Sequence, residues 1–231
     1  MIGSGQIYRL ACRVGLMGVS CISLCGVMTS CNDTDNNPEY REATVSNVVT
    51  YVGGDNRGAV FEYVKIDDAL PVRLSTSVTI DDKVQPGQRY MMTYHPVNGD
   101  EMASGSVEPT SISAITTLDV SERDISFYPY WNKSGVYLLS AWRSGLYLNI
   151  RCKLAYSESP RALLLAPQLG VSEVGNLYLV HEAPDDVTFD RVYFISFNLS
   201  EYLSENPSVK ILKIHVNNTN LDEDVLTFQL Q

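Results

Sequence analysis

The chain has 231 residues, of which 17 are Lys or Arg and 27 are Asp or Glu, and its net charge at neutral pH is −10. A charge of this sign repels nucleic-acid phosphates and anionic lipid headgroups, so it excludes nucleic acid as a partner and a basic surface as a means of membrane binding. The chain is long enough for one large domain or two small ones.

The first 30 residues have the composition of an export signal. Arg9 and Arg13 supply positive charge with no acidic residue, and an uncharged run extends from Val14 to Met28. This run of about 15 residues is shorter than the roughly 20 that cross a bilayer easily. The segment 1–30 is therefore predicted to be a signal peptide.

The signal ends in a motif that implies lipidation. Met28-Thr29-Ser30-Cys31 resembles the lipobox of bacterial lipoproteins, in which the cysteine is acylated and becomes the new N-terminus. The resemblance implies acyl chains such as palmitate on Cys31 and attachment to the outer membrane, at its periplasmic or its surface face. Several acyl chains make such an anchor effectively stable. A plain signal peptide and an uncleaved anchor are the alternatives.

Cleavage before Cys31 changes the charge and the thiol content. Loss of Arg9 and Arg13 leaves 15 basic and 27 acidic residues, a net charge of −12. Of the five cysteines, three leave with the signal and Cys31 carries lipid, so Cys152 is the one thiol of the body. One thiol forms no intrachain disulfide, and its place in an alternating apolar run predicts a small buried hydrophobe.

A polar segment and a first group of strands follow. Residues 31–40 comprise the lipidated cysteine and an acidic stretch that lacks apolar side chains, which predicts a flexible tether. Residues 41–121 contain about five β-rich runs separated by Gly, Pro, Asn and Asp turns, with strands expected at 43–52, 59–66, 71–80, 89–94 and 107–120. Five strands in about 80 residues predict a small OB-like barrel.

A second group of strands occupies residues 122–231. Short apolar runs between turns are expected at 125–130, 136–142, 147–155, 162–166, 176–181, 191–199, 209–216 and 225–230. Regular short strands of this kind predict a β-sandwich. Residues 199–205 are predicted to form a short helix, with Ser200 as its cap and Leu199 and Leu203 on one face. The predicted fold class is therefore all-β, with an OB-like barrel followed by a sandwich.

Three segments of the second half resemble the NigD-like family of Bacteroidetes lipoproteins. Residues 142–150 (WRSGLYLNI) are similar to its W-x-x-G-x-Y-L-N strand, residues 177–186 to its L-x-L-x-H…D segment, and residues 194–199 to its Ser-Phe-x-Leu stretch. The resemblance implies an OB-like domain and a sandwich behind a lipid anchor. The family's name comes from a bacteriocin-linked locus, which implies an immunity or envelope role without defining any chemistry.

No residue pattern predicts an active site, a metal or a cofactor. His95, His181 and His215 are far apart, and none has the spacing of a zinc ligand set. No Gly-x-Ser-x-Gly elbow is present, and the adjacent acid pairs are typical of solvated turns. We therefore expect no enzymatic activity.

The best candidate for a binding surface is a group of aromatic and polar residues. Tyr128, Tyr130 and Trp131 stand beside a turn, where rings favour partner binding, although strand alternation makes packing in the core the alternative. His181, Asp185 and Asp186 could contact a carbohydrate or a weakly held metal, or simply satisfy hydrogen bonds at a strand end. The expected function is a lipid-anchored envelope protein that binds a protein, a peptide toxin or a glycan. A structural subunit of an outer-membrane complex is the alternative, and an envelope hydrolase is less favoured.

Overall fold

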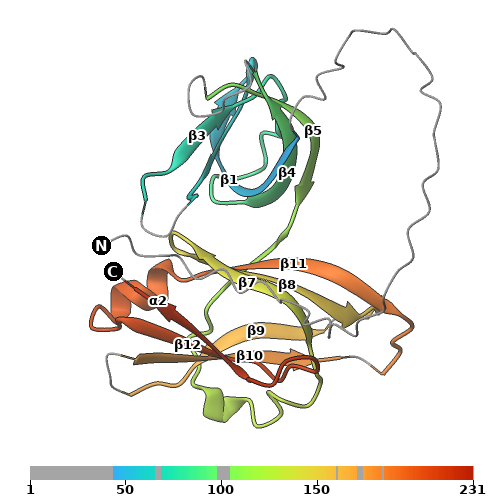
Figure 1. Cartoon of the computed structure of the whole chain (residues 1–231), viewed down its shortest axis with the longest axis vertical. Helices are drawn as coiled ribbons and strands as arrows, with labels where there is room; N and C mark the ends of the chain where they lie inside the picture. The colour runs from blue at the N-terminus through green and yellow to red at the C-terminus, as the bar shows by residue number, and fades with distance from the viewer. Residues whose placement is uncertain are drawn as a thin grey trace, which may run out of the picture.

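The computed structural model describes residues 44–230 except 66–68, 98–104, 160, 171–173 and 184. Within these residues the protein is almost entirely β, as the alternating sequence pattern predicts, and its strands form three sheets (Figure 1). No helix in the described part is long and apolar enough to cross a bilayer. The predicted signal, Cys31 and the tether lie outside the described residues.

One five-stranded sheet forms the first unit. Its strands are β1 (Val45–Asp55), β2 (Gly58–Tyr63), β3 (Val72–Ser75), β4 (Arg89–Pro96) and β5 (Val107–Ala114), in the order β3-β2-β1-β4-β5. Among the described residues, the two edge strands approach each other at a parallel bridge between Ser75 and Ser106, where the Ser75 amide donates to the Gly105 carbonyl at 2.6 Å. The sheet therefore curls toward a barrel without a complete closing ladder, in keeping with the predicted OB-like unit.

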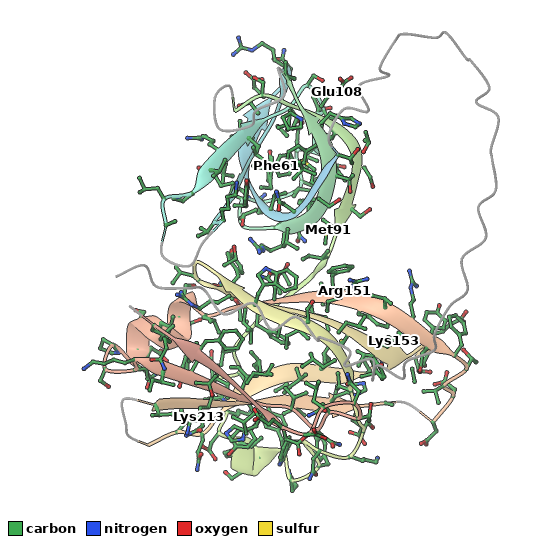
Figure 2. All side chains as sticks on the ribbon, viewed as in Figure 1. Phe61, Met91, Glu108, Arg151, Lys153 and Lys213 are labelled. Carbon is green, nitrogen blue, oxygen red and sulfur yellow. The ribbon has the colours of Figure 1, made fainter. Side chains whose placement is uncertain are left out.

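Aromatic side chains fill the inside of this curled sheet. Phe61 is fully buried and contacts Tyr51 and Tyr90 edge to face, with ring centroids 5.8 Å apart in both pairs. Figure 2 shows Phe61 enclosed by the surrounding strands. Alternate residues of β2 and β4 point inward, because successive side chains of a strand leave opposite faces. This alternation is the physical basis of the predicted first domain.

Two four-stranded sheets pack face to face in the second unit. The first contains β6 (Thr116–Asp119), β11 (Asp190–Asn198), β8 (Tyr147–Ala155) and β7 (Tyr137–Ser144), in that order. The second contains β13 (Val225–Gln229), β12 (Ile211–His215), β10 (Val174–Glu182) and β9 (Ala162–Pro167). Leu148, Ile150, Leu177, Phe197 and Leu212 form part of the shared core and are at most 1% exposed. The arrangement is the sandwich that the sequence predicts (Figure 1).

Three strand predictions need correction. In the range 71–80 the strand is confined to β3 (Val72–Ser75). Residues 125–130 form no strand: η2 (Ile125–Phe127) is a 3-10 helix, because the Asp124 carboxylate accepts from the Ser126 amide at 2.8 Å and stabilises a turn. The strand expected at 107–120 divides after Ala114, and β6 pairs in parallel with β11 of the sandwich. The domain division after residue 121 stays a prediction.

The short helix is present as α2 (Ser200–Glu205). Its first residue does not cap it; the Asn198 side-chain oxygen instead accepts from the Ser200 amide at 3.1 Å. Leu199 is fully buried and Leu203 packs against the core, as their spacing predicts.

Arg89 connects the two units. It begins β4 in the first unit, is 1% exposed, and donates from Nη2 to the Asn149 side-chain oxygen of β8 at 2.9 Å. Its Nη1 donates to Thr50 Oγ1 at 2.7 Å, its Nε to Ser196 Oγ at 3.4 Å, and its guanidinium carbon lies 4.2 Å from the centre of the Tyr147 ring. Burial lowers the pKa of Arg89 to about 10. These contacts hold the first unit against Asn149 and Ser196, which are partners on β8 and β11 of the β6-β11-β8-β7 sheet.

Candidate binding surface

The connection between β6 and β7 crosses the outer face of the β13-β12-β10-β9 sheet, which is called the lower sheet. It starts at the β9 edge, where the Ser121 amide donates to the Leu165 carbonyl at 2.7 Å, and ends near β12, where the Val136 amide donates to the Asn217 carbonyl at 2.9 Å. Figure 1 shows η2 beneath this sheet. Outward-facing Val180 is fully buried, and the crossing segment runs beside it, since the Trp131 carbonyl accepts from the His181 amide at 3.5 Å. The crossing therefore brings the predicted aromatic residues onto the lower sheet.

Three rings form a continuous row on this face. Trp131 of the crossing segment meets Tyr178 of β10 edge to face, with centroids 5.1 Å apart. Tyr178 stacks on His215 of β12, with centroids 4.2 Å apart and planes 7° apart, because the two residues are partners in the parallel β10–β12 ladder. All three side chains are half-buried. Trp131, Tyr178 and His215 are named the ring row below.

Polar groups border the ring row. A ring nitrogen of His215 lies 3.1 Å from the Asn176 side-chain oxygen, and the Tyr178 hydroxyl donates to the Gln168 side-chain oxygen at 3.4 Å. An aromatic surface with adjacent amides and hydroxyls can bind a partner through apolar contact and hydrogen bonds together. Sequence reasoning found Trp131 and missed Tyr178 and His215, since no local pattern states which strands are neighbours.

Two further predicted rings lie on the same segment. Tyr128 and Tyr130 contact each other edge to face at 6.4 Å between centroids. Tyr130 is 37% exposed, whereas Tyr128 is half-buried, with its hydroxyl 3.0 Å from Ser121 Oγ. The structure thus brings Tyr128, Tyr130 and Trp131 to one side of the sandwich, as a binding surface requires.

His181 has to be removed from the predicted surface. It is 1% exposed, because it follows Leu177 and Leu179 on the inward-facing side of β10. Arg161 Nη1 lies 3.5 Å from His181 Nε2, which fits a neutral imidazole that accepts there. Strand alternation was the signal that could have placed this ring inward.

Asp185 and Asp186 are exposed, and Asp186 is hydrogen-bonded to two nearby serines. The Asp186 carboxylate accepts from Ser157 Oγ at 2.6 Å and from Ser159 Oγ at 2.9 Å, and these bonds hold the pKa of Asp186 below its ordinary value. Asp185 is exposed beside it. These contacts describe an ordered turn, and a role of Asp185 and Asp186 in binding stays a prediction.

The described residues hold no metal-binding cluster and no exposed thiol. No three His, Cys, Asp or Glu side chains gather closely enough to hold a metal within this part of the chain. Cys152 is 1% exposed, and burial raises the pKa of its thiol to about 12, so it is a core side chain as predicted rather than a nucleophile.

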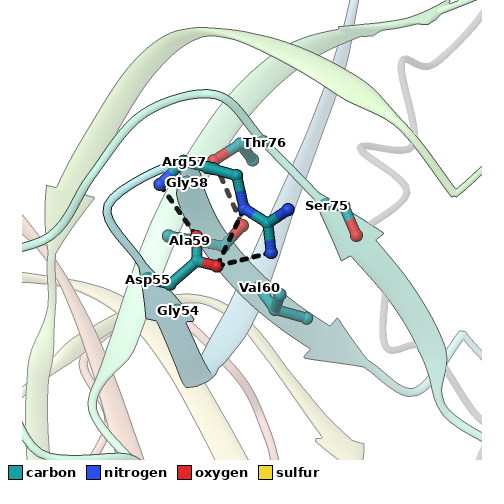
Figure 3. A pocket seen from close by; sticks show the side chains of 8 residues that line it. All are labelled: Gly54, Asp55, Arg57, Gly58, Ala59, Val60, Ser75 and Thr76. Atoms are coloured by element: carbon teal, nitrogen blue, oxygen red, sulfur yellow. Dashed lines mark hydrogen bonds and ion pairs between the residues drawn. The ribbon is translucent and has the colours of Figure 1, made fainter.

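An open hollow lies at the far end of the first unit, around the β1–β2 turn (Figure 3). Its charged residues neutralise each other, since Asp55 Oδ2 accepts from Arg57 Nε at 3.0 Å and from Nη2 at 2.9 Å. Backbone and small side chains form the rest of the lining, including Gly58 and Thr76. The hollow has no uncompensated charge or ring that would select a ligand.

The two histidines at the lower sheet predict an acid-sensitive fold. Burial lowers the pKa of both His181 and His215, and the positive charges of Arg161 and Lys213 respectively lower them further. As pH falls through the ordinary value near 6.5, the unfolded chain takes up protons that the folded chain resists, so stability is lost. We expect the urea midpoint to be constant above about pH 7 and to fall between about pH 6.5 and 5.

The control is a pair of variants, His181→Asn and His215→Asn, measured over the same range. Each should flatten the pH dependence, because one proton-binding difference is removed. An identical slope in both variants and the wild type would contradict the assignment.

Solved structures from Bacteroidetes share this architecture. A protein of unknown function from Bacteroides vulgatus superposes with a TM-score of 0.63 at 17% identity, over 82% of this chain and 92% of that one. A NigD-like immunity protein from Bacteroides caccae gives 0.53 at 17% identity, over 80% and 91%. A candidate lipoprotein from Bacteroides fragilis gives 0.53 at 10% identity, over 82% and 97%. No protein-family model and no curated relative matches the sequence.

The class of protein defined by these findings is an all-β protein of two units. At such identities the likeness shows the fold. Its architecture is that of a NigD-like protein, so the resemblance expected from residues 142–150, 177–186 and 194–199 is confirmed at the level of the fold.

Proposed function

We propose that this chain is a lipid-anchored protein of the bacterial cell envelope that binds an envelope protein without catalysing a reaction. Cys31 is the anchor in this proposal, at the outer membrane, and residues 41–121 and 122–231 are its two domains. The observation that carries the binding role is the ring row of Trp131, Tyr178 and His215, half-buried on the outer face of a sheet.

The structural neighbours support an accessory role. One is described as an immunity protein and another as a candidate lipoprotein. The described residues add no metal cluster and no reactive thiol, so nothing there favours an enzyme over a binding protein. Trp and Tyr are the residue types that most often dominate a protein interface.

The test is comparative capture from envelope extract. Full-length protein with a C-terminal tag is expressed in a Bacteroides host as wild type and as Trp131→Ala, and bound proteins are quantified by mass spectrometry. A buried interface Trp contributes about 2 kcal/mol or more, so Trp131→Ala should weaken the partner's apparent affinity roughly 30-fold. Thermal unfolding of both proteins checks that the variant is folded.

Two controls separate the parts of the proposal. Phe189→Ala removes another exposed ring, which is 59% exposed and stacks on Tyr156 instead of on the ring row, and it should retain the partner. Cys31→Ala should move the protein from the membrane to the soluble fraction. Equal recovery by Trp131→Ala and wild type contradicts the ring row, and membrane retention of Cys31→Ala contradicts the lipid anchor.

A further inference from the structure

A second face of the sandwich carries two neighbouring positive charges. In β8, Ile150, Cys152 and Leu154 point into the core, so Arg151 and Lys153 point out of the opposite side. Both are exposed. Their neighbours across the ladders, with the two cations themselves, are named the basic face: Tyr137, Ser140, Arg151, Lys153, Val192 and Phe194.

The positively charged groups of Arg151 and Lys153 lie over aromatic rings and not beside carboxylates. The Arg151 guanidinium carbon lies 5.3 Å from the centre of the Phe194 ring, and Lys153 Nζ lies 5.0 Å from that of Tyr137. The ion pairs found among the described residues are Asp55–Arg57, Glu62–Arg73 and Lys133–Glu182, and none involves the basic face. A ring holds a cation in place without neutralising it. Two full positive charges therefore stand side by side in a chain of net charge −10.

The first unit leaves this face accessible. It covers the adjacent row of the same sheet, where Arg89 bonds Asn149 and Ser196. Beyond that row, Tyr137 is 43% and Val192 is 39% exposed. Figure 2 shows Arg151 and Lys153 on the side of the sandwich that faces the first unit. The basic face is thus an accessible surface of the sandwich, next to the contact between the two units.

We propose that the basic face is a docking site for an extended acidic segment of a partner protein. Arg151 and Lys153 are two residues apart on one strand, about 7 Å, which is also the spacing of acidic side chains at alternate positions of an extended peptide. The guanidinium of Arg151 can donate two parallel hydrogen bonds to one carboxylate, and the ammonium of Lys153 can donate one. Phe194, Val192 and Tyr137 offer apolar contact between and beside the charges.

This recognition acts at short range. The net negative charge of the whole protein repels an acidic partner at a distance, but salt screens that repulsion beyond about 8 Å at physiological ionic strength. Ion pairs between the basic face and the carboxylates of the partner then determine the affinity. The site uses none of the ring-row residues, so it goes beyond the proposed function and does not depend on it.

The probe is a fluorescent extended peptide with Glu at three alternating positions and Val between them. Its control has Gln in place of each Glu. Binding to the full-length lipidated protein in nonionic detergent is measured by anisotropy. We expect the Glu peptide to bind at least tenfold more tightly than the Gln peptide and to weaken when salt rises from about 0.05 to 0.5 M.

Four variants locate the binding. Arg151→Gln with Lys153→Gln should lower the affinity at least tenfold, and each single change should lower it severalfold. Lys213→Gln is the matched control, because Lys213 is an exposed strand lysine on the other sheet, and it should bind as wild type does. Thermal unfolding checks that each variant is folded.

Three results overturn the proposal: no preference for the Glu peptide, equal affinity of the double variant and wild type, or an equal loss in Lys213→Gln. Vesicles containing phosphatidylglycerol form a further arm. Binding to these vesicles that exceeds peptide binding and depends on Arg151 would identify a lipid headgroup instead, and would also overturn it. Capture through Trp131 is unaffected by Arg151→Gln in either case, so failure here is distinct from failure of the ring row.

Discussion

Arg89→Ala is expected to lower the free energy of unfolding by about 2–4 kcal/mol. The guanidinium is 1% exposed and bonds Thr50, Asn149 and Ser196 at the joint between the two units. Its removal takes one donor from each of these side-chain oxygens, although Asn149 still accepts from Ser196 Oγ at 2.6 Å, and it opens a void against Tyr147. Both effects destabilise a fold. Urea unfolding followed by far-UV circular dichroism measures the change.

Two further substitutions give this prediction its controls. Arg73→Ala removes an exposed arginine whose Nε lies 3.8 Å from a Glu62 oxygen, and it should change stability little. Arg89→Lys keeps the charge but loses the planar fork that reaches three acceptors, so it should behave more like alanine than like wild type. A value for Arg89→Ala within about 0.5 kcal/mol of wild type would show that the joint does not depend on this side chain.

Gly58→Ala is expected to be the most damaging substitution in the β1–β2 turn. A Cβ at this position would lie 1.8 Å from the Thr76 carbonyl oxygen, which is backbone and cannot rotate away. The residue also has a φ of +156°. The Thr76 amide donates a hydrogen bond to the Ala59 carbonyl at 2.9 Å. Displacing this segment would therefore disturb the contact between the β1–β2 turn and the chain after β3.

Gly53→Ala is the matched control for this clash. Gly53 has a similar φ of +146°, but a Cβ added there would have nothing within 4 Å of it. Gly53→Ala should therefore cost only the backbone strain, about 1–2 kcal/mol, while Gly58→Ala should cost about 2 kcal/mol more. Thermal and urea unfolding of the two variants compare them directly, and equal losses would contradict the close approach at Gly58.

Local sequence patterns predicted most of the strands. Residues 147–155 alternate between apolar and polar side chains, and β8 occupies the same range. The pattern failed at residues 125–130, where the Asp124 side chain bonds the backbone and makes a turn more favourable than a strand. Apolar periodicity reports which side of a strand is buried, and it does not register a single hydrogen bond of this kind.

The candidate surface was only partly predictable. Trp131 was identified beside its turn, but its neighbours Tyr178 and His215 are distant in the chain and meet through the parallel pairing of β10 with β12. Strand order is set by the crossing connections and by the packing of whole sheets, which leave no periodic mark in the sequence. His181 was placed wrongly because its neighbouring acids were weighed above the inward face that it shares with Leu177 and Leu179.

By itself, the sequence determined the all-β class, the burial of Cys152 and the predicted lipidation motif at Cys31, because each depends on residues close together in the chain. Only the tertiary structure decided which strands lie side by side. That choice creates the ring row, sets Arg151 and Lys153 over Phe194 and Tyr137, and buries Arg89 between the units. Contacts of this kind join residues tens of positions apart, and they exist only once the sheets have formed and packed.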